Sequence, residues 1–178
     1  MEAAMRFIFC LIILSGLGLA APAIACGPEV TIQFSESSPD RFHIKFVRGP
    51  KLRLTSLRIN LSGSAAGAIF DDHGGLEMQG PQPGPSGVAI RSIKYRTQGQ
   101  ETVTLTFDGF DEQRTFDFLS DLDDSGSTGD RDQNHLVEGE LTGAAAHATL
   151  LSENGRHIQI EGRFDKLGRA RLGERACV

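Results

Sequence analysis

The feature that most restricts the fold of this chain is a regular alternation of apolar and polar residues in short segments. In one segment Val103, Leu105 and Phe107 alternate with threonines, and a second segment with Phe116 and Phe118 on one face follows it. A side-chain period of two residues is typical of a β-strand with one buried face. These two predicted strands run into a loop rich in aspartates and glycines, so one stretch of sequence indicates both an architecture and a candidate ligand site.

Similar segments recur along the chain, and patterns with a helical period are nearly absent. Turn residues separate the segments at intervals of roughly eight to twelve residues, as expected for an antiparallel sandwich. The sequence predicts an all-β fold, a single antiparallel β-sandwich of Greek-key or jelly-roll type over residues 26–178. Phenylalanines, eleven in the full sequence and nine of them after residue 25, are expected to supply the aromatic core. The predicted strands are 30–34, 41–47, 51–61, 66–70, 88–96, 102–107, 114–122, 136–141, 144–152, 157–164 and 169–172.

Two stretches are harder to assign. The alanine run at 144–148 fits a helix or a strand, but the alternation of Ala146, Ala148 and Leu150 favours a strand. Residues 74–87 contain several prolines and glycines, which exclude a central strand. We interpret them as a connection between sheets.

Residues 1–25 have the pattern of a secretory signal peptide. Arg6 precedes an apolar run, and Ala23-Ile24-Ala25 fits a cleavage site. The apolar run is short for a transmembrane helix, so no membrane span is predicted. The start is Met1 or Met5. The predicted localisation is secreted or periplasmic.

Two cysteines remain after the signal peptide, Cys26 and Cys177. In an oxidising compartment two such thiols tend to form a disulfide. A disulfide here would close nearly the whole chain and contribute on the order of 5 kcal/mol. Alternatively, Ala23-Ile24-Ala25-Cys26 resembles a lipobox with Ala in place of the usual Leu, and the protein is then a lipoprotein anchored through Cys26. Both alternatives stay open.

The charge of the chain argues against nucleic acid as a partner. The net charge is −5, whereas nucleic-acid binding needs clustered Lys and Arg. The basic residues are scattered, with only a mild concentration near the C-terminus that we interpret as a solvated basic tail: Arg163, Lys166, Arg169, Arg171 and Arg175. The sequence contains no GxSxG, HExxH, CxxC or P-loop motif. We therefore favour a protein that is not an enzyme. The alternative is a hydrolase of polysaccharide that uses paired carboxylates such as Asp108, Asp111 and Asp121.

The acidic loop matches the opening of a calcium-binding loop. Oxygen-bearing side chains stand at alternate positions, Gly126 is at the sixth place and Asp132 at the twelfth. A glutamate would be the usual closing ligand, and the flanking segments are strands, so calcium would bind in a sandwich loop. The competing interpretation is an exposed acidic hairpin without a metal, and Asp71-Asp72-His73 is interpreted as a plain turn. The candidate calcium ligands are Asp121, Asp123, Ser125, Asp130 and Asp132.

Several short motifs resemble those of one family. They are Leu105-Thr106-Phe107, Phe116-Asp117-Phe118 with Asp121, Asp123 and Asp124, then Gly139-Glu140-Leu141 with Gly143 and Ala144, and the segment 56–72. On these motifs, over most of residues 29–172, the chain resembles the aggregation factor core-like secreted bacterial proteins, named after a component of marine sponge adhesion complexes. The resemblance implies a secreted β-sandwich and suggests calcium-linked adhesion, with an unknown surface partner. We therefore expect a non-enzymatic, calcium-binding protein that acts in cell-surface adhesion or extracellular assembly.

Overall fold

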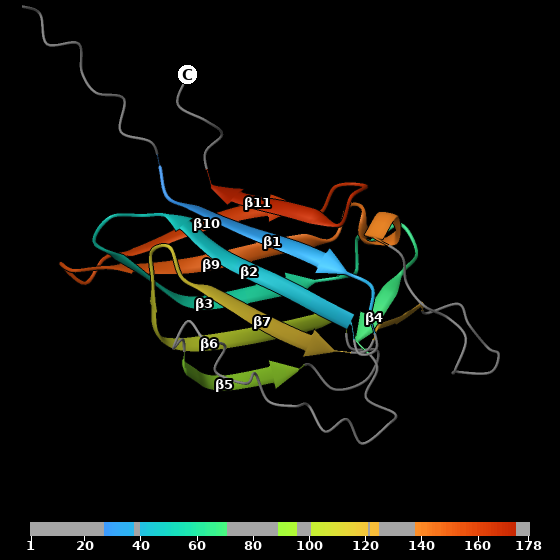
Figure 1. Ribbon diagram of the computed structural model, residues 1–178, viewed down its shortest axis with the longest axis horizontal. Helices are drawn as coiled ribbons and strands as arrows, with labels where there is room; N and C mark the ends of the chain where they lie inside the picture. Colours follow the sequence, from blue (N-terminus) through green and yellow to red (C-terminus); the bar gives the residue numbers. More distant parts are fainter. Residues whose placement is uncertain are drawn as a thin grey trace, which may run out of the picture.

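The alternating segments form antiparallel strands that pack as two layers. The computed structural model of the 178-residue chain describes residues 27–37, 40–70, 89–95, 101–120, 122–124 and 138–173. In the segment 89–95 it describes the backbone and the side chain of Arg91. Figure 1 shows the two sheets one behind the other, with β1, β2 and β7 in front of β9, β3 and β6.

The front layer, sheet A, has four strands in the order β11-β1-β2-β7. Its strands are β1 (Glu29–Ser35), β2 (Asp40–Arg48), β7 (Thr115–Ser120) and β11 (Arg169–Gly173). The back layer, sheet B, has five strands in the order β10-β9-β3-β6-β5. Its strands are β3 (Leu52–Asn60), β5 (Ala89–Tyr95), β6 (Thr102–Asp111), β9 (Ala145–Ser152) and β10 (His157–Arg163).

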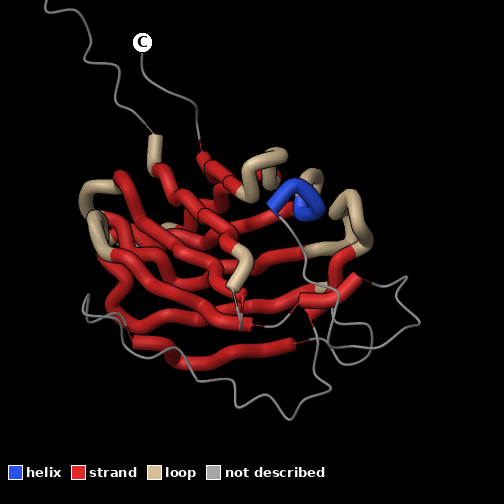
Figure 2. The backbone as a smooth tube through the Cα atoms, turned by 45° about the vertical axis from the view of Figure 1, so that its right-hand side comes forward, coloured by secondary structure: helices blue, strands red, loops and turns tan. Residues whose placement is uncertain are grey.

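A third, small sheet joins β4 (Ala68–Phe70) to β8 (Leu122–Asp124). In sheet B, β3 lies between β6 and β9, so its neighbours in space are not its neighbours in sequence, as Greek-key connections require. In Figure 2 strands make up most of the described chain and are joined by loops and a short helical turn. The predicted all-β sandwich is confirmed.

The inward-facing residues of the two sheets form a single aromatic and aliphatic core. Every phenylalanine in the described part of the chain is at most 4% exposed. Phe42 of sheet A is central to one ring cluster, with centroids 5.2 Å from Phe34 and 5.8 Å from Phe118. Phe107 and Phe116 connect sheet B to sheet A at 5.4 Å. Burial of each such side chain contributes about 2–3 kcal/mol, which makes this core the main driving force for the packing of the sheets.

At one edge of the sandwich the two sheets come close together. The chain passes directly from β10 in sheet B to β11 in sheet A, and Phe164 and Ala170 form an isolated β-bridge there. A Cβ atom at Gly162 would lie 2.2 Å from the carbonyl oxygen of Arg171. Only glycine allows the backbones to approach this closely. We call this region the closed edge.

The segment 136–141 was predicted as a strand, and this prediction is wrong. Its described part, Glu138–Leu141, is a 3₁₀ turn labelled η1. The amide of Thr142 donates to the carbonyl of Gly139 at 3.2 Å, which is a local bond between residues three apart. Leu141 is the buried residue of this turn. A single apolar side chain can be buried from a turn, without the pairing to a neighbouring strand that a β-strand needs.

The predicted strand 114–122 is interrupted. Residues 115–120 belong to sheet A as β7, whereas Leu122 begins β8 and pairs with Phe70 of β4. The alternation of Phe116 and Phe118 correctly predicts β7. The sequence contains no signal that the chain changes its partner strand after residue 120. The alanine run belongs to β9, so the choice of strand there is confirmed. The predicted connection 74–87 lies outside the described residues.

Candidate functional site

The acidic segment predicted to bind calcium begins at the end where β4 and β8 pair. Asp123 lies in β8 opposite Ile69 of β4. The other candidate ligands, Asp121, Ser125, Asp130 and Asp132, lie outside the described residues, as do Asp71, Asp72 and His73. Among the residues that the structure describes, no three His, Cys, Asp or Glu side chains are grouped as a metal site. Calcium binding therefore stays a prediction.

A buried carboxylate that the sequence did not indicate holds this acidic end together. Asp40, the first residue of β2, is 2% exposed. Its Oδ1 accepts a hydrogen bond from the amide of Ser37 at 3.1 Å, and its Oδ2 accepts one from the amide of Leu122 at 3.3 Å. Asp40 thereby ties the start of β8 to sheet A. The sequence before β2 contains no motif that would have separated Asp40 from a surface aspartate.

Of the three carboxylates suggested for a hydrolase, Asp121 lies outside the described residues. The other two, Asp108 and Asp111, lie at the far end of β6 and face different neighbours. The Oδ2 of Asp108 is 3.5 Å from an Nη atom of Arg91 on β5. The Oδ1 of Asp111 is 3.3 Å from Nε of Arg53 on β3. Each carboxylate is therefore occupied by an arginine of the adjacent strand, on opposite sides of β6.

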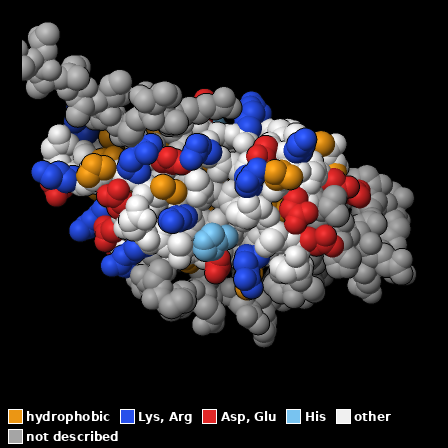
Figure 3. All heavy atoms as spheres, turned by 45° about the horizontal axis from the view of Figure 1, so that its top comes forward, with side chains coloured by type: hydrophobic (Ala, Val, Ile, Leu, Met, Phe, Trp, Pro, Cys, Tyr) orange, Lys and Arg blue, Asp and Glu red, His pale blue; other side chains and the backbone are white. Residues whose placement is uncertain are grey.

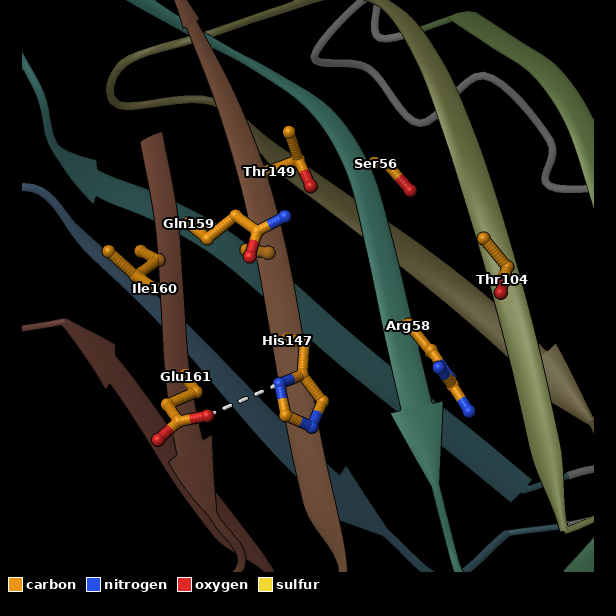
Figure 4. Close-up of a pocket in the computed structure, with 9 residues that line it drawn as sticks. Ser56, Arg58, Thr104, His147, Thr149, Gln159, Ile160 and Glu161 are labelled. Carbon is orange, nitrogen blue, oxygen red and sulfur yellow. Dashed lines mark ion pairs between the residues drawn. The ribbon is translucent and has the colours of Figure 1, made fainter. Parts of the chain in front are cut away.

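The outer face of sheet B carries a shallow groove of about 620 Å³ that we call the polar groove. Figure 4 shows its hydroxyl, amide, imidazole, guanidinium and carboxylate groups side by side on four strands. Its polar side chains are Ser56, Arg58, Thr104, His147, Thr149, Gln159 and Glu161. The strand register explains this arrangement, because residues with the same orientation stand opposite one another.

One row of the polar groove crosses the sheet from Glu161 through His147 and Arg58 to Thr104. The Nδ1 of His147 lies 3.4 Å from a carboxylate oxygen of Glu161, and both side chains are largely exposed. Within the described part of the chain Arg58 makes no ion pair. The groove therefore offers hydrogen-bond donors and acceptors on a flat surface, which suits contact with a hydroxylated ligand.

The outer face of sheet A carries a second groove, of about 800 Å³, next to the closed edge. We call it the basic groove, because its lining includes Lys45, Arg163, Arg169 and Arg171. Glu161 lines both grooves. The two surfaces therefore continue into each other around β10.

Beside the basic groove, a buried carboxylate joins three parts of the chain. The side chain of Glu29 is 5% exposed and receives a bond of 3.1 Å from an Nη atom of Arg48. The Nε of Arg171 lies 2.6 Å from Oε1 of Glu29 and forms an ion pair with it, but the geometry does not meet that of a hydrogen bond. The paired arginines compensate the burial of this charge. The sequence alone did not indicate Glu29.

Asp165 shapes the turn between β10 and β11. Its Oδ1 accepts hydrogen bonds from the amides of Leu167 at 2.8 Å and Arg169 at 3.0 Å. Slight burial acts to raise the pKa of this carboxyl, but these amides and the guanidinium of Arg169 outweigh it and hold the pKa below its ordinary value. The turn therefore presents a stable negative charge next to Arg169.

Comparisons with known proteins give no relative from which a role could be transferred. No family model, curated protein or solved structure matches the chain. The resemblance to aggregation factor core-like proteins therefore stays a prediction, and the function is inferred from the two grooves and the acidic end.

The first and last described strands pair with each other near the two ends of the chain, an arrangement compatible with the predicted disulfide. Glu29, at the start of β1, pairs with Gly173, at the end of β11. Cys26 and Cys177 lie outside the described residues, three and four positions beyond this pair. No described helix has the length and apolar character needed to cross a bilayer.

Proposed function

We propose that this protein is an extracellular, non-enzymatic binding protein that acts in cell-surface adhesion or assembly through the outer faces of its sheets. The observation that carries the proposal is the presence of two open grooves, the polar groove on sheet B and the basic groove on sheet A, on opposite layers of the sandwich. Shallow grooves lined by exposed side chains suit contact with an extended surface polymer. The predicted signal peptide at residues 1–25 supports a secreted or periplasmic location.

Calcium binding at the acidic end is a second part of the proposal. Phe70 of β4 pairs with Leu122 of β8. In the sequence Asp71 directly follows Phe70, and Asp121 directly precedes Leu122. Two acidic segments are therefore covalently attached to paired residues, beside the buried Asp40. Carboxylates held close together repel one another, and a divalent cation would relieve that repulsion.

A binding assay with labelled protein tests the adhesive function. The protein is incubated with intact bacterial cells and with extracellular polysaccharide, and heat-denatured protein is the control. We expect the folded protein to be retained without release of sugar reducing ends. No retention on any of these materials would contradict the proposal. Release of reducing ends would favour the polysaccharide hydrolase instead.

Calorimetric titration with Ca²⁺ and thermal unfolding test the metal separately. We expect heat of binding and a higher Tm in millimolar calcium, because a ligand that binds only the folded state stabilises it. Asp123→Asn should reduce the shift in Tm, and Asp108→Asn, which removes an exposed carboxylate at the opposite end of β6, should not. An unchanged Tm in the unaltered protein would remove calcium from the proposal.

A further inference from the structure

The basic groove has an excess of positive charge on a protein that is acidic as a whole. Lys45, Arg163, Arg169 and Arg171 line it, although the net charge of the chain is −5. Figure 3 shows Lys and Arg side chains gathered on one face of the molecule, with single acidic side chains between them. A cationic region on an acidic protein favours an anionic partner at that place and disfavours it elsewhere.

The cations of the groove differ in how far neighbouring acids neutralise them. Lys45 makes no ion pair with any residue that the structure describes. Arg163 donates an Nη1 hydrogen bond of 2.8 Å to the carbonyl of Gly143, which leaves its charge uncompensated. Arg169 lies 3.6 Å from Asp165. Since most of the positive charge at Lys45 and Arg163 is available, these two positions should dominate the attraction of an anion.

The acids that face the groove limit the density of charge. Glu161 and Asp165 are part of its lining. On β7, Asp117 lies 2.7 Å from His43 of the same outer face. The buried Glu29 is held by Arg48 and Arg171. The positive charges are therefore spaced, and the surface suits an anion with separated charges better than a dense polyphosphate.

Neutral polar side chains stand between the cations in the strand register. Arg171 is opposite Thr31, which is opposite Lys45. In the next row Gln33 stands between Arg169 and His43. Gln33 donates both amide bonds to the carbonyls of Phe34 and Leu167, which leaves its side-chain oxygen as an acceptor.

Cations alternate with hydroxyl and amide groups at the spacing of adjacent strands, about 4.8 Å. A guanidinium binds a carboxylate or sulfate through two parallel hydrogen bonds, and the neutral side chains can bond sugar hydroxyls. We propose that the basic groove binds an acidic polysaccharide, with Lys45 and Arg163 contacting its charged groups. This inference depends on the proposed function as an extracellular binding protein.

The surface fits other polyanions less well. Single-stranded nucleic acids are bound by stacking on exposed aromatic rings, and all described phenylalanines are buried. Attachment to a lipid surface needs a broad apolar area, and Leu167 is the exposed large apolar residue of the described chain. Nucleic acid and anionic lipid are therefore outcomes that would overturn the inference.

Binding to polygalacturonate tests the inference, with its methyl-esterified form as the uncharged control polymer. We expect binding to the acidic polymer that weakens with salt, and little binding to the ester. Lys45→Glu should weaken binding by roughly tenfold, because it replaces an attraction by a repulsion. Arg156→Glu makes the same change of charge at an exposed position that lines neither groove, and it should leave affinity unchanged. The Tm of each variant shows that it is folded.

Three results would overturn the inference. They are equal binding of the ester and the acid, equal loss of affinity in the two variants, and stronger binding to duplex DNA or to phosphatidylglycerol vesicles than to polygalacturonate. Retention on cells in any of these cases would leave the adhesive function standing. Loss of retention on all cells and polysaccharides would instead remove the adhesive function itself.

Discussion

The closed edge and the acidic end of the sandwich are held together in opposite ways. At the closed edge β10 and β11 approach through glycine, and the surrounding surface is basic. At the acidic end β8 is attached to sheet A by the buried carboxylate of Asp40, next to a segment rich in aspartates. The closed edge is therefore held by direct contact between backbones, whereas the acidic end depends on the hydrogen bonds of a buried carboxylate. The proposed calcium ion would add to the stability of the acidic end alone.

The largest expected effect concerns the disulfide, which would pin the strand pair beside the closed edge. Reduction, or replacement of Cys26 and Cys177 by Ser, should lower the free energy of unfolding by about 5 kcal/mol in the loop-entropy model. Denaturant unfolding with and without reductant measures this difference. Mass spectrometry of the mature protein distinguishes the bridge from its alternative: a diacylglycerol on Cys26 would contradict the disulfide.

A substitution at Gly162 tests the close approach of the backbones. Gly162→Val should lower the free energy of unfolding by about 3 kcal/mol or more, since its Cβ would lie 2.2 Å from the carbonyl of Arg171. Gly139→Ala is the matched control, because its Cβ would be 3.6 Å from the nearest atom, the carbonyl oxygen of Lys166. Equal stability of the two variants would contradict the description of the closed edge.

At the acidic end the corresponding test is Asp40→Ala. It leaves the amides of Ser37 and Leu122 without their buried acceptor, which costs about 1–3 kcal/mol. Asp108→Ala removes an exposed carboxylate from an ion pair and should change stability by less than about 1 kcal/mol. Urea unfolding compares the two variants. If Asp108→Ala were the more destabilising, Asp40 would not have the structural role assigned to it.

The smallest effect is a pH dependence at the closed edge. The folded protein holds the pKa of Asp165 below its ordinary value, so the ionised carboxylate stabilises the fold above the ordinary pKa. This stabilisation is lost as the pH falls through the lowered pKa. Asp165→Asn keeps an acceptor for both turn amides and removes only the charge. Its stability should be slightly lower than that of the unaltered protein at pH 7 and equal at about pH 2, and a difference independent of pH would contradict this role.

Much of the fold follows from the sequence because a period of two residues is a local signal. Val103, Leu105 and Phe107 alternate in the sequence and are buried in the structure. The partners of a strand are not local, and for this reason the break between β7 and β8 was missed. The turn at Glu138–Leu141 was missed because one buried leucine looks the same in a strand and in a turn.

The sites were predictable only in part. Repeated aspartates marked the acidic segment, of which Asp123 and Asp124 are described. The buried acids Asp40 and Glu29 have no sequence signature, since their burial depends on amides and arginines from distant strands. Three cations of the basic groove, Arg163, Arg169 and Arg171, stand close together in the sequence and were interpreted as a solvated basic tail. The groove was missed because only folding brings Lys45 of β2 beside them.

The separation of a basic binding surface from an acidic metal end is the central claim, and NMR titration of the ¹⁵N-labelled protein tests it most directly. With oligogalacturonate we expect amide shifts at Lys45, Arg163 and Arg169, and with Ca²⁺ we expect them at Leu122–Asp124. Saccharide shifts at Leu122–Asp124 with none at Lys45 and Arg163, or no calcium shifts in β8, would contradict the account.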